Sequence, residues 1–271
     1  MNRGSAMNRG NGMNRGNAMN LSNAMNLLSR ARERAVFSDF RHGWFVIILW
    51  IVYAILWFGG VGSHFLFGAT PAGMNWTAPL LLWVGTLLTF IAAPDDWRTL
   101  AISFVAGIAI EVVGVATGFP FGRYNYTPVL GFAILAVPLA MGCAWVILLA
   151  WVRQLRLPVL AAAAVMTAVD LGLDPVTTRI LDLWRWRTPG RYYGVPWTNY
   201  AGWFAVSLIL FACLPPGRHN PNVFAVGSTV LLLFALIGLA HGFFVPSSML
   251  CLLCGAGYWR WRASSNVLIS T

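Results

Sequence analysis

Lysine is absent from the 271-residue sequence, because all 18 basic residues are arginine. Enzymes that form a lysine Schiff base, and nucleotide-binding proteins that use a P-loop lysine, are therefore excluded. Acidic residues are few as well, since eight of them give a net charge of +10. In a soluble protein this charge favours nucleic acid, but here the arginines flank apolar segments, where they typically set membrane topology. We therefore predict no nucleic-acid partner.

Charge of either sign is scarce. Charged residues make up 10% of the chain and hydrophobic residues 58%, whereas a soluble domain carries roughly 25% charged residues. The apolar runs last about 15–22 residues, the length of a membrane-spanning helix, and none alternates like a barrel strand. The sequence therefore predicts an all-α polytopic transmembrane bundle with about seven or eight spans, in contact with membrane lipids.

Cysteine and cofactor motifs are also sparse. The four cysteines are Cys143, Cys213, Cys251 and Cys254. The last two form a C-x-x-C inside an apolar run without a second pair, so packing is a better explanation than a metal site or a disulfide framework. His64 and His241 are isolated and lack ligand spacing. No nucleotide, haem or metalloprotease motif is present, and we predict neither a metal nor a cofactor.

The chain divides into a tail and a helical domain. Residues 1–30 are five six-residue repeats that begin with Met-Asn, and we predict a disordered, low-complexity tail, with Met19 or Met25 as alternative start sites. The transmembrane domain covers 31–262, and a short tail covers 263–271. The predicted spans are 44–60, 76–93, 99–117, 129–151, 157–173, 198–214 and 222–245, with a weaker eighth at 247–259.

Arginine counts give an orientation. With the N-terminus in the cytoplasm and the repeats set aside, ten arginines face the cytoplasm and five face the opposite side, which favours an integral inner-membrane protein with a cytoplasmic N-terminus. The ten are Arg30, Arg32, Arg34, Arg41, Arg98, Arg153, Arg156, Arg218, Arg260 and Arg262. The five are Arg123, Arg179, Arg185, Arg187 and Arg191.

Three acids lie within or beside predicted spans: Glu111, Asp170 and Asp174. A carboxylate at the centre of a span costs about 2.5–3.5 kcal/mol on insertion scales, so such residues usually face a cavity and mark function. Glu111 shares a helical face with Gly107 and Gly114, where another helix or a flat ligand can approach closely. The alternative is a structural carboxyl group that bonds to a neighbouring helix.

Asp174 has a second explanation, because it precedes Pro175. Aspartate at an N-cap with proline at N1 begins a helix, here over 175–187, and asparagine would serve there equally well. Asp170 has no such explanation. Asp182 is expected to pair with Arg179 or Arg185 at the membrane interface.

Two aromatic loops complete a candidate site. One covers 119–128, and the other runs from Trp184 to Trp203. Aromatic residues at an interface often form a lipid-anchoring belt. However, alternating topology places both loops on the same side as the ends of the spans with Glu111 and Asp170. This convergence predicts one site.

The same residues carry a resemblance to the carotenoid biosynthesis membrane protein family, which includes carotenoid hydratases. It covers roughly residues 44–260. The matching positions are Glu111 with Gly114 and Gly118, Pro120-Phe-Gly-x-Tyr-x-Tyr126, Leu130-Gly131, Val137-Pro138, Trp145, Asp170-x-x-x-Asp174-Pro175, Trp184-x-Trp186, and Tyr193-Gly-Val-Pro-x-x-Asn199-x-x-Gly-Trp203.

The resemblance implies addition of water to the terminal double bond of an acyclic (ψ) carotenoid end in the bilayer, giving a tertiary alcohol without a cofactor. A buried carboxylic acid can hold the required proton. Glu111, Asp170 and Asp174 are the candidate catalytic residues. The candidate substrate-binding residues are Tyr124, Tyr126, Trp184, Trp186, Tyr193, Asn199 and Trp203. A carotenoid end-group cyclase and a non-enzymatic isoprenoid-binding or transport protein remain alternatives.

Overall fold

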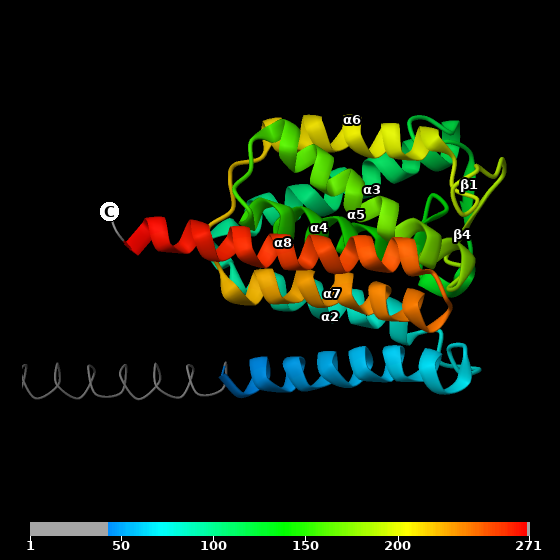
Figure 1. Cartoon of the computed structure of the whole chain (residues 1–271), viewed down its shortest axis with the longest axis horizontal. Helices are drawn as coiled ribbons and strands as arrows, with labels where there is room; N and C mark the ends of the chain where they lie inside the picture. The colour runs from blue at the N-terminus through cyan, green and yellow to red at the C-terminus, as the bar shows by residue number, and fades with distance from the viewer. Residues whose placement is uncertain (1–42, 270–271) are drawn as a thin grey trace, which may run out of the picture. The chain divides into compact units, whose positions relative to one another are not determined.

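The computed structural model describes residues 43–269, and its helices follow the apolar segments of the sequence (Figure 1). After an N-terminal helix, Gly43–Phe67, come α2 (Thr77–Ala92), α3 (Trp97–Thr117), α4 (Leu139–Gln154), α5 (Val159–Arg179), α6 (Trp197–Cys213), α7 (Pro221–Ala240) and α8 (Phe244–Ile269). The predicted helical bundle is confirmed. The repeat tail lies outside the described residues.

Residues 50–269 form one compact unit, whereas 43–49, which are helical, belong to a separate unit. Within the larger unit, the N-terminal helix is tied to α7 by polar side chains. The Tyr53 hydroxyl lies 2.9 Å from Thr229 Oγ1, and Trp57 Nε1 donates to the Thr229 carbonyl at 2.7 Å. Hydrogen bonds of this kind join helices in a membrane, where apolar contact alone gives little specificity.

The surface of the bundle is apolar, as a bilayer requires. Large side chains such as Phe58, Leu66, Val105 and Ile209 are exposed by more than 60%, an arrangement that a water-soluble monomer rarely tolerates over large areas. Among residues 43–269, four helices are long and apolar enough to cross a membrane: Gly43–Phe67, Pro94–Thr117, Val159–Arg179 and Pro221–Ala240. α2, α4 and α6 are apolar but shorter.

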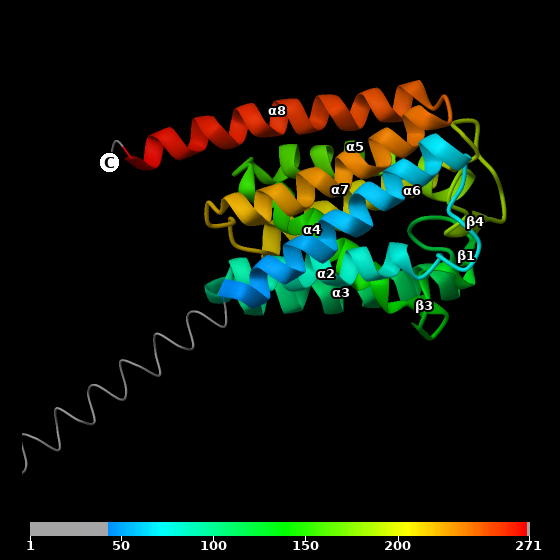
Figure 2. The ribbon, with the colours of Figure 1, turned by 90° about the horizontal axis from the view of Figure 1, so that it is seen from below.

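Helix α4 is the centre of the larger unit, because it packs against α2, α3, α5 and α7. Trp145 and Trp151 on this helix are both fully buried. A helix that is apolar on every face needs partners on every side, and Figures 1 and 2 show α4 enclosed by its neighbours. Because it is shielded in this way, α4 can be shorter than a lipid-facing span.

Three predicted boundaries were wrong, and a proline or a glycine explains two of them. The segment 129–151 becomes helical only at Leu139, because Pro138 occupies the N-cap. Residues before it form a short hairpin of β2 (Ala133–Ile134) and β3 (Val137–Pro138). Helix α7 stops at Ala240, before Gly242 with φ +76°. The weak segment 247–259 is part of the 26-residue helix α8.

Strand pairing at one end of the bundle was not predicted. β1 (Tyr124–Tyr126) pairs antiparallel with β4 (Trp184–Trp186), and both strands lie at the end where α3 and α5 finish (Figure 1). Three residues are too short for an alternating pattern to be recognised in sequence. The pairing joins the two aromatic loops into a single structure.

Helix α5 passes through Pro175 without interruption, so the predicted N-cap at Asp174 and the helix over 175–187 were both wrong. Proline in a helix leaves the carbonyl four residues earlier without its donor. That carbonyl belongs to Leu171, and the Tyr192 hydroxyl donates to it at 3.3 Å. The loop after β4 thus supplies the hydrogen bond that Pro175 removes, as a membrane interior demands.

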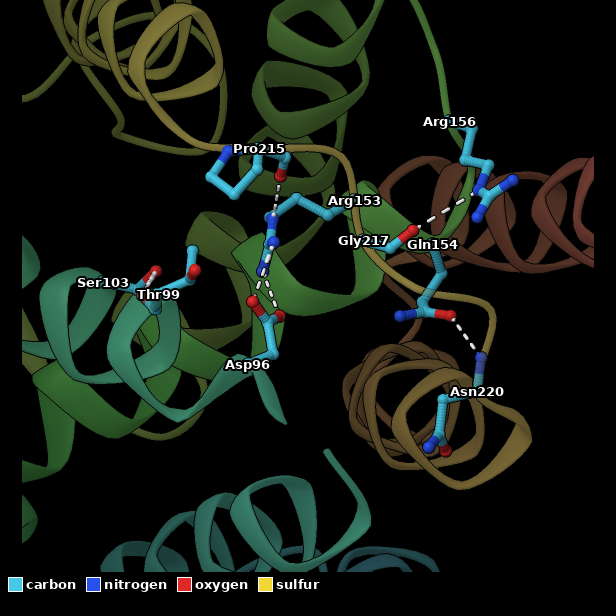
Figure 3. A network of polar contacts seen from close by, with 9 residues as sticks. All are labelled: Asp96, Thr99, Ser103, Arg153, Gln154, Arg156, Pro215, Gly217 and Asn220. Atoms are coloured by element: carbon cyan, nitrogen blue, oxygen red, sulfur yellow. Dashed lines mark hydrogen bonds and ion pairs between the residues drawn. The ribbon is translucent and has the colours of Figure 1, made fainter. Parts of the chain in front are cut away.

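A polar network joins the helices at the opposite end of the bundle (Figure 3). Arg153, with 3% of its side chain exposed, pairs with Asp96 at 2.7 Å and donates from Nε to the Pro215 carbonyl at 2.8 Å. The adjacent Gln154 side chain accepts from the backbone N–H of Asn220, the N-cap residue of α7. The network fixes the start of α3 against the end of α4 and the α6–α7 loop.

We expect Arg153→Gln to destabilise the protein by about 3–5 kcal/mol, because it leaves the Asp96 carboxylate partly buried without its counter-charge. Arg218→Gln is the matched control. It breaks an ion pair with Asp95 whose side chains are 78% and 75% exposed, and such pairs contribute at most about 1 kcal/mol. The measurement is the denaturation midpoint of each variant in detergent, and equal midpoints would contradict the prediction.

The arginines in the described part of the chain are nearly balanced between the two ends. Six lie at the Asp96 end and five at the β1–β4 end. The ten-to-five ratio therefore depends on Arg30, Arg32, Arg34 and Arg41, which lie outside the described residues. The orientation of the N-terminus stays a prediction.

Candidate active site

The β1–β4 end of the bundle collects the buried acids. Glu111 lies in the second half of α3, and Asp170 and Asp174 lie in the second half of α5. Asn199 is in the first turn of α6, which starts at this same end. All four side chains are at most 3% exposed. The predicted convergence of the two acid-bearing spans is therefore present in the structure.

Glu111 accepts three hydrogen bonds. The Tyr124 and Tyr126 hydroxyls donate to Oε2 at 2.5 and 2.7 Å, and Trp145 Nε1 donates to Oε1 at 3.0 Å. Every partner is a donor, so the glutamate is held as an acceptor at both oxygens. Hydrogen bonds donated to a carboxylate favour its ionised form, which is the form that can accept a proton.

Two glycines allow these partners to reach Glu111. A Cβ atom at Gly107 would lie 2.5 Å from Trp145 Cβ, and one at Gly114 would lie 2.8 Å from the Tyr124 hydroxyl. The small-residue face predicted beside Glu111 thus receives α4 and the first aromatic loop. Trp145 is fixed from its other side by Trp203, whose ring stacks on it at 4.3 Å and 9°.

We expect Gly107→Ala to separate α3 from α4 and to destabilise the protein by about 1–3 kcal/mol, as overpacking usually does. It should also lower activity, because Trp145 then loses its position on Glu111. Gly255→Ala on α8 is the control, since a Cβ there meets nothing within 4 Å. Thermal midpoint and product yield are measured for both, and a Gly107→Ala protein as stable and active as Gly255→Ala contradicts the packing argument.

The strand pair positions the two tyrosines. In the β1–β4 pairing, Tyr124 lies opposite Trp186 and Tyr126 lies opposite Trp184. The ring centroids of these two pairs are 5.1 and 5.9 Å apart. Burial, and the Glu111 carboxylate beside them, raise the pKa of both tyrosine hydroxyls. The hydroxyls therefore keep their protons at neutral pH and remain donors to Glu111.

Asp170 and Asp174 form a carboxyl pair one helical turn apart. Asn199 Nδ2 donates to both, at 2.6 Å to Asp170 and 2.7 Å to Asp174. Because both accept from the same amide nitrogen, the two carboxyl groups lie close together. Two carboxylates this close cannot both be ionised without strong repulsion, so the pair is arranged to share a proton.

A small cavity is lined by both Glu111 and Asp174. The space open to the centre of a water molecule is about 20 Å³. Its walls are Glu111, Phe121, Tyr124, Tyr126, Met141, Asp174, Trp184, Trp186, Asn199 and Trp203. Two carboxyl groups from different helices thus face one aromatic cavity.

Most of the predicted site residues line the cavity, but two of them do not. Eight of the ten line the cavity, whereas Asp170 reaches it only through Asn199 and Asp174. Tyr193 lies outside the lining and packs on Tyr192 and Phe243. Sequence reasoning assigned no site role to Trp145, although it belongs to the motifs of the resemblance. The signal available in the sequence was its place among those motifs, because its contact with Glu111 joins positions 34 residues apart.

Other predicted polar residues lie apart from the cavity. Asp182 pairs with Arg185, whose hydrogen bonds hold the pKa of Asp182 below its usual value. His64 and His241 are not isolated, since His64 Nδ1 lies 2.9 Å from His241 Nε2. Within residues 43–269, no group of three or more histidines, cysteines and acids is arranged to hold a metal. The four cysteines are free thiols.

Comparison with known proteins agrees with the resemblance. Residues 78–257 match the family described as carotenoid biosynthesis protein. A curated relative, the bisanhydrobacterioruberin hydratase of Haloarcula japonica, is 35% identical over 118 residues. The match covers 38% of this chain and 40% of that protein, so the chain spans less than half of the relative. No solved structure matches.

Proposed function

Because this chain belongs to the carotenoid biosynthesis protein family, we propose that it is a carotenoid hydratase, which adds water to the terminal double bond of an acyclic carotenoid end group and forms a tertiary alcohol. The observation that carries the proposal is the cavity, which Glu111 and Asp174 line together with aromatic rings at one end of an apolar bundle. Alkene hydration needs a proton donor, a proton acceptor and water, and these groups can supply the first two.

The aspartate pair is the proton donor in this scheme. Asp174 gives its proton to the less substituted carbon of the double bond, and the π electrons form the new C–H bond. The remaining tertiary carbon becomes a cation. Asn199 donates hydrogen bonds to both Asp174 and Asp170. Asn199 and Asp170 therefore position Asp174. General acid catalysis of this kind typically contributes about 10²–10⁴-fold in rate.

Glu111 is the proton acceptor. A lone pair of water forms the C–O bond with the tertiary carbon, and one water proton passes to Glu111, which leaves the neutral alcohol. Proton exchange between the carboxyl groups and water then restores both sites. The assignment follows from hydrogen bonding: Glu111 receives three donors, whereas Asp170 and Asp174 share a single amide nitrogen.

The aromatic walls suit the cationic intermediate. The rings of Trp184, Trp186 and Trp203 line the cavity together with the two tyrosines. A cation over such a face gains about 0.5–2 kcal/mol per ring, and it gains this only after protonation. The walls therefore stabilise the transition state leading to the cation more than the neutral alkene.

Expression in a lycopene-producing host, with mass analysis of the pigments, tests the proposal. A product that has gained one molecule of water supports a hydratase. A product of unchanged mass with fewer acyclic ends identifies a cyclase, which starts with the same protonation but then loses a proton. Unchanged lycopene, in a host that accumulates the protein in its membranes, contradicts both enzymatic functions for this substrate.

A further inference from the structure

The cavity between Glu111 and Asp174 is far too small for a carotenoid end group. A space of about 20 Å³ for water centres corresponds to roughly one water molecule, which needs about 10–15 Å³ by this measure. A terminal isoprenoid unit is several times larger. The cavity itself therefore suits the smaller reactant.

Trp186 lines this cavity and carries a hydrogen-bond donor without an acceptor in the described part of the chain. Its ring lines the cavity and packs on Tyr124, which bonds to Glu111. Among the described residues, the Trp186 Nε1–H is buried and meets no acceptor. A buried N–H without an acceptor costs about 1–3 kcal/mol, so its retention in a reactive cavity needs an explanation. By contrast, the Trp145 N–H is satisfied by Glu111.

We propose that this cavity binds the water molecule that is added to the carotenoid, and that the Trp186 N–H donates a hydrogen bond to its oxygen. The inference rests on the proposed hydratase function and identifies the binding site of the second substrate. The water then accepts from Trp186 and donates to Glu111, which leaves a lone pair for the tertiary carbon. A held water at this point captures the cation before it loses a proton.

Loss of the held water changes the fate of the cation. Without capture, the cation gives a proton from a neighbouring carbon to a carboxylate and returns to the alkene. In D₂O the returning alkene carries deuterium, because the first proton came from exchanged carboxyl groups. The ratio of hydrated product to deuterated alkene therefore reports water capture, separately from the overall rate of protonation.

The test compares Trp186→Phe with the wild-type protein, in membranes supplied with an acyclic carotene in D₂O. Removing one hydrogen bond to the water should lower the ratio of hydrated product to deuterated alkene by about tenfold. Trp261→Phe is the matched control. The Trp261 N–H is also buried and has no acceptor among the described residues. Trp261 lies in the second half of α8, far from the cavity. The ratio for Trp261→Phe should equal that of the wild type.

An unchanged ratio in Trp186→Phe overturns the water site while leaving the hydratase function intact. A wild-type protein that forms no hydrated product overturns the function itself. If Trp186→Phe fails to accumulate, β-(3-benzothienyl)alanine at position 186 replaces it, since sulfur takes the place of the N–H in a ring of nearly the same shape. The same fall in the ratio is expected, and a wild-type ratio contradicts the proposal.

Discussion

Glu111→Gln should lower the yield of hydrated carotenoid, per unit of membrane-inserted protein, by about 10²–10⁴-fold. In the proposed mechanism Glu111 takes a proton from the attacking water, and a glutamine amide cannot do so. The expected loss corresponds to about 3–5.5 kcal/mol of activation free energy. The measurement is initial product formation in membranes with the protein level determined on the same sample.

The Glu111→Gln variant also needs a stability control. Three donors converge on the carboxyl group, and a glutamine retains only one acceptor oxygen. One donor therefore faces an NH₂ group, at a cost of about 1–3 kcal/mol. Asp182→Asn is the matched activity control, because it neutralises an exposed acid at the same end of the bundle. Near-normal turnover in Glu111→Gln would remove this residue from the mechanism.

Asp170→Asn and Asp174→Asn should each reduce turnover by about 10²–10⁴-fold, and the double variant should be no worse than the more severe single variant. Either change removes the shared proton, so the second change has nothing further to remove. Residues that act as one catalytic unit are non-additive in this way. The measurement is product formation by the two single variants and the double variant at matched expression.

Multiplicative losses in the double variant would show that the two aspartates act independently. A near-normal Asp174→Asn would be a different failure, because it would return Asp174 to a structural role. A mild effect of this change follows from the helix-cap explanation, since asparagine caps a helix as well as aspartate. The helix-cap explanation does not hold in the structure, because α5 continues through Pro175 and Asp174 lines the cavity. A mild effect is therefore not expected.

The acids of the site could be predicted from sequence because a bilayer makes them expensive. Glu111 and Asp170 stand out within apolar runs, and the cost of burying a carboxylate identifies them without any motif. Alternating topology then places both at one end. The spans themselves follow from hydropathy, so the bundle was predicted with errors mainly at the helix ends.

The roles of the acids could not be predicted, because they depend on contacts between distant segments. Glu111 is an acceptor since Trp145, 34 residues away, donates to it. The aspartates are a pair since Asn199 bridges them from another helix. Neither contact follows from a periodic pattern or from a fixed spacing in the sequence.

The strand pair and the helix through Pro175 were missed for local reasons. Three-residue strands give no periodic signal, and an Asp-Pro step normally begins a helix. The structure departs from that rule because Tyr192 replaces the hydrogen bond lost at Leu171. The exception therefore arises from tertiary contact, which local sequence does not encode.

If the protein adds water to the carotenoid, the hydroxyl oxygen of the product comes from water, and oxygen labelling follows this atom. Membranes containing the protein are supplied with an acyclic carotene in H₂¹⁸O, and the pigments are analysed by mass spectrometry. We expect a product that has gained one molecule of water, carries heavy oxygen in its hydroxyl group and disappears in Glu111→Gln. A hydroxylated product without the heavy oxygen, or a product of unchanged mass with a ring at its end, would contradict it.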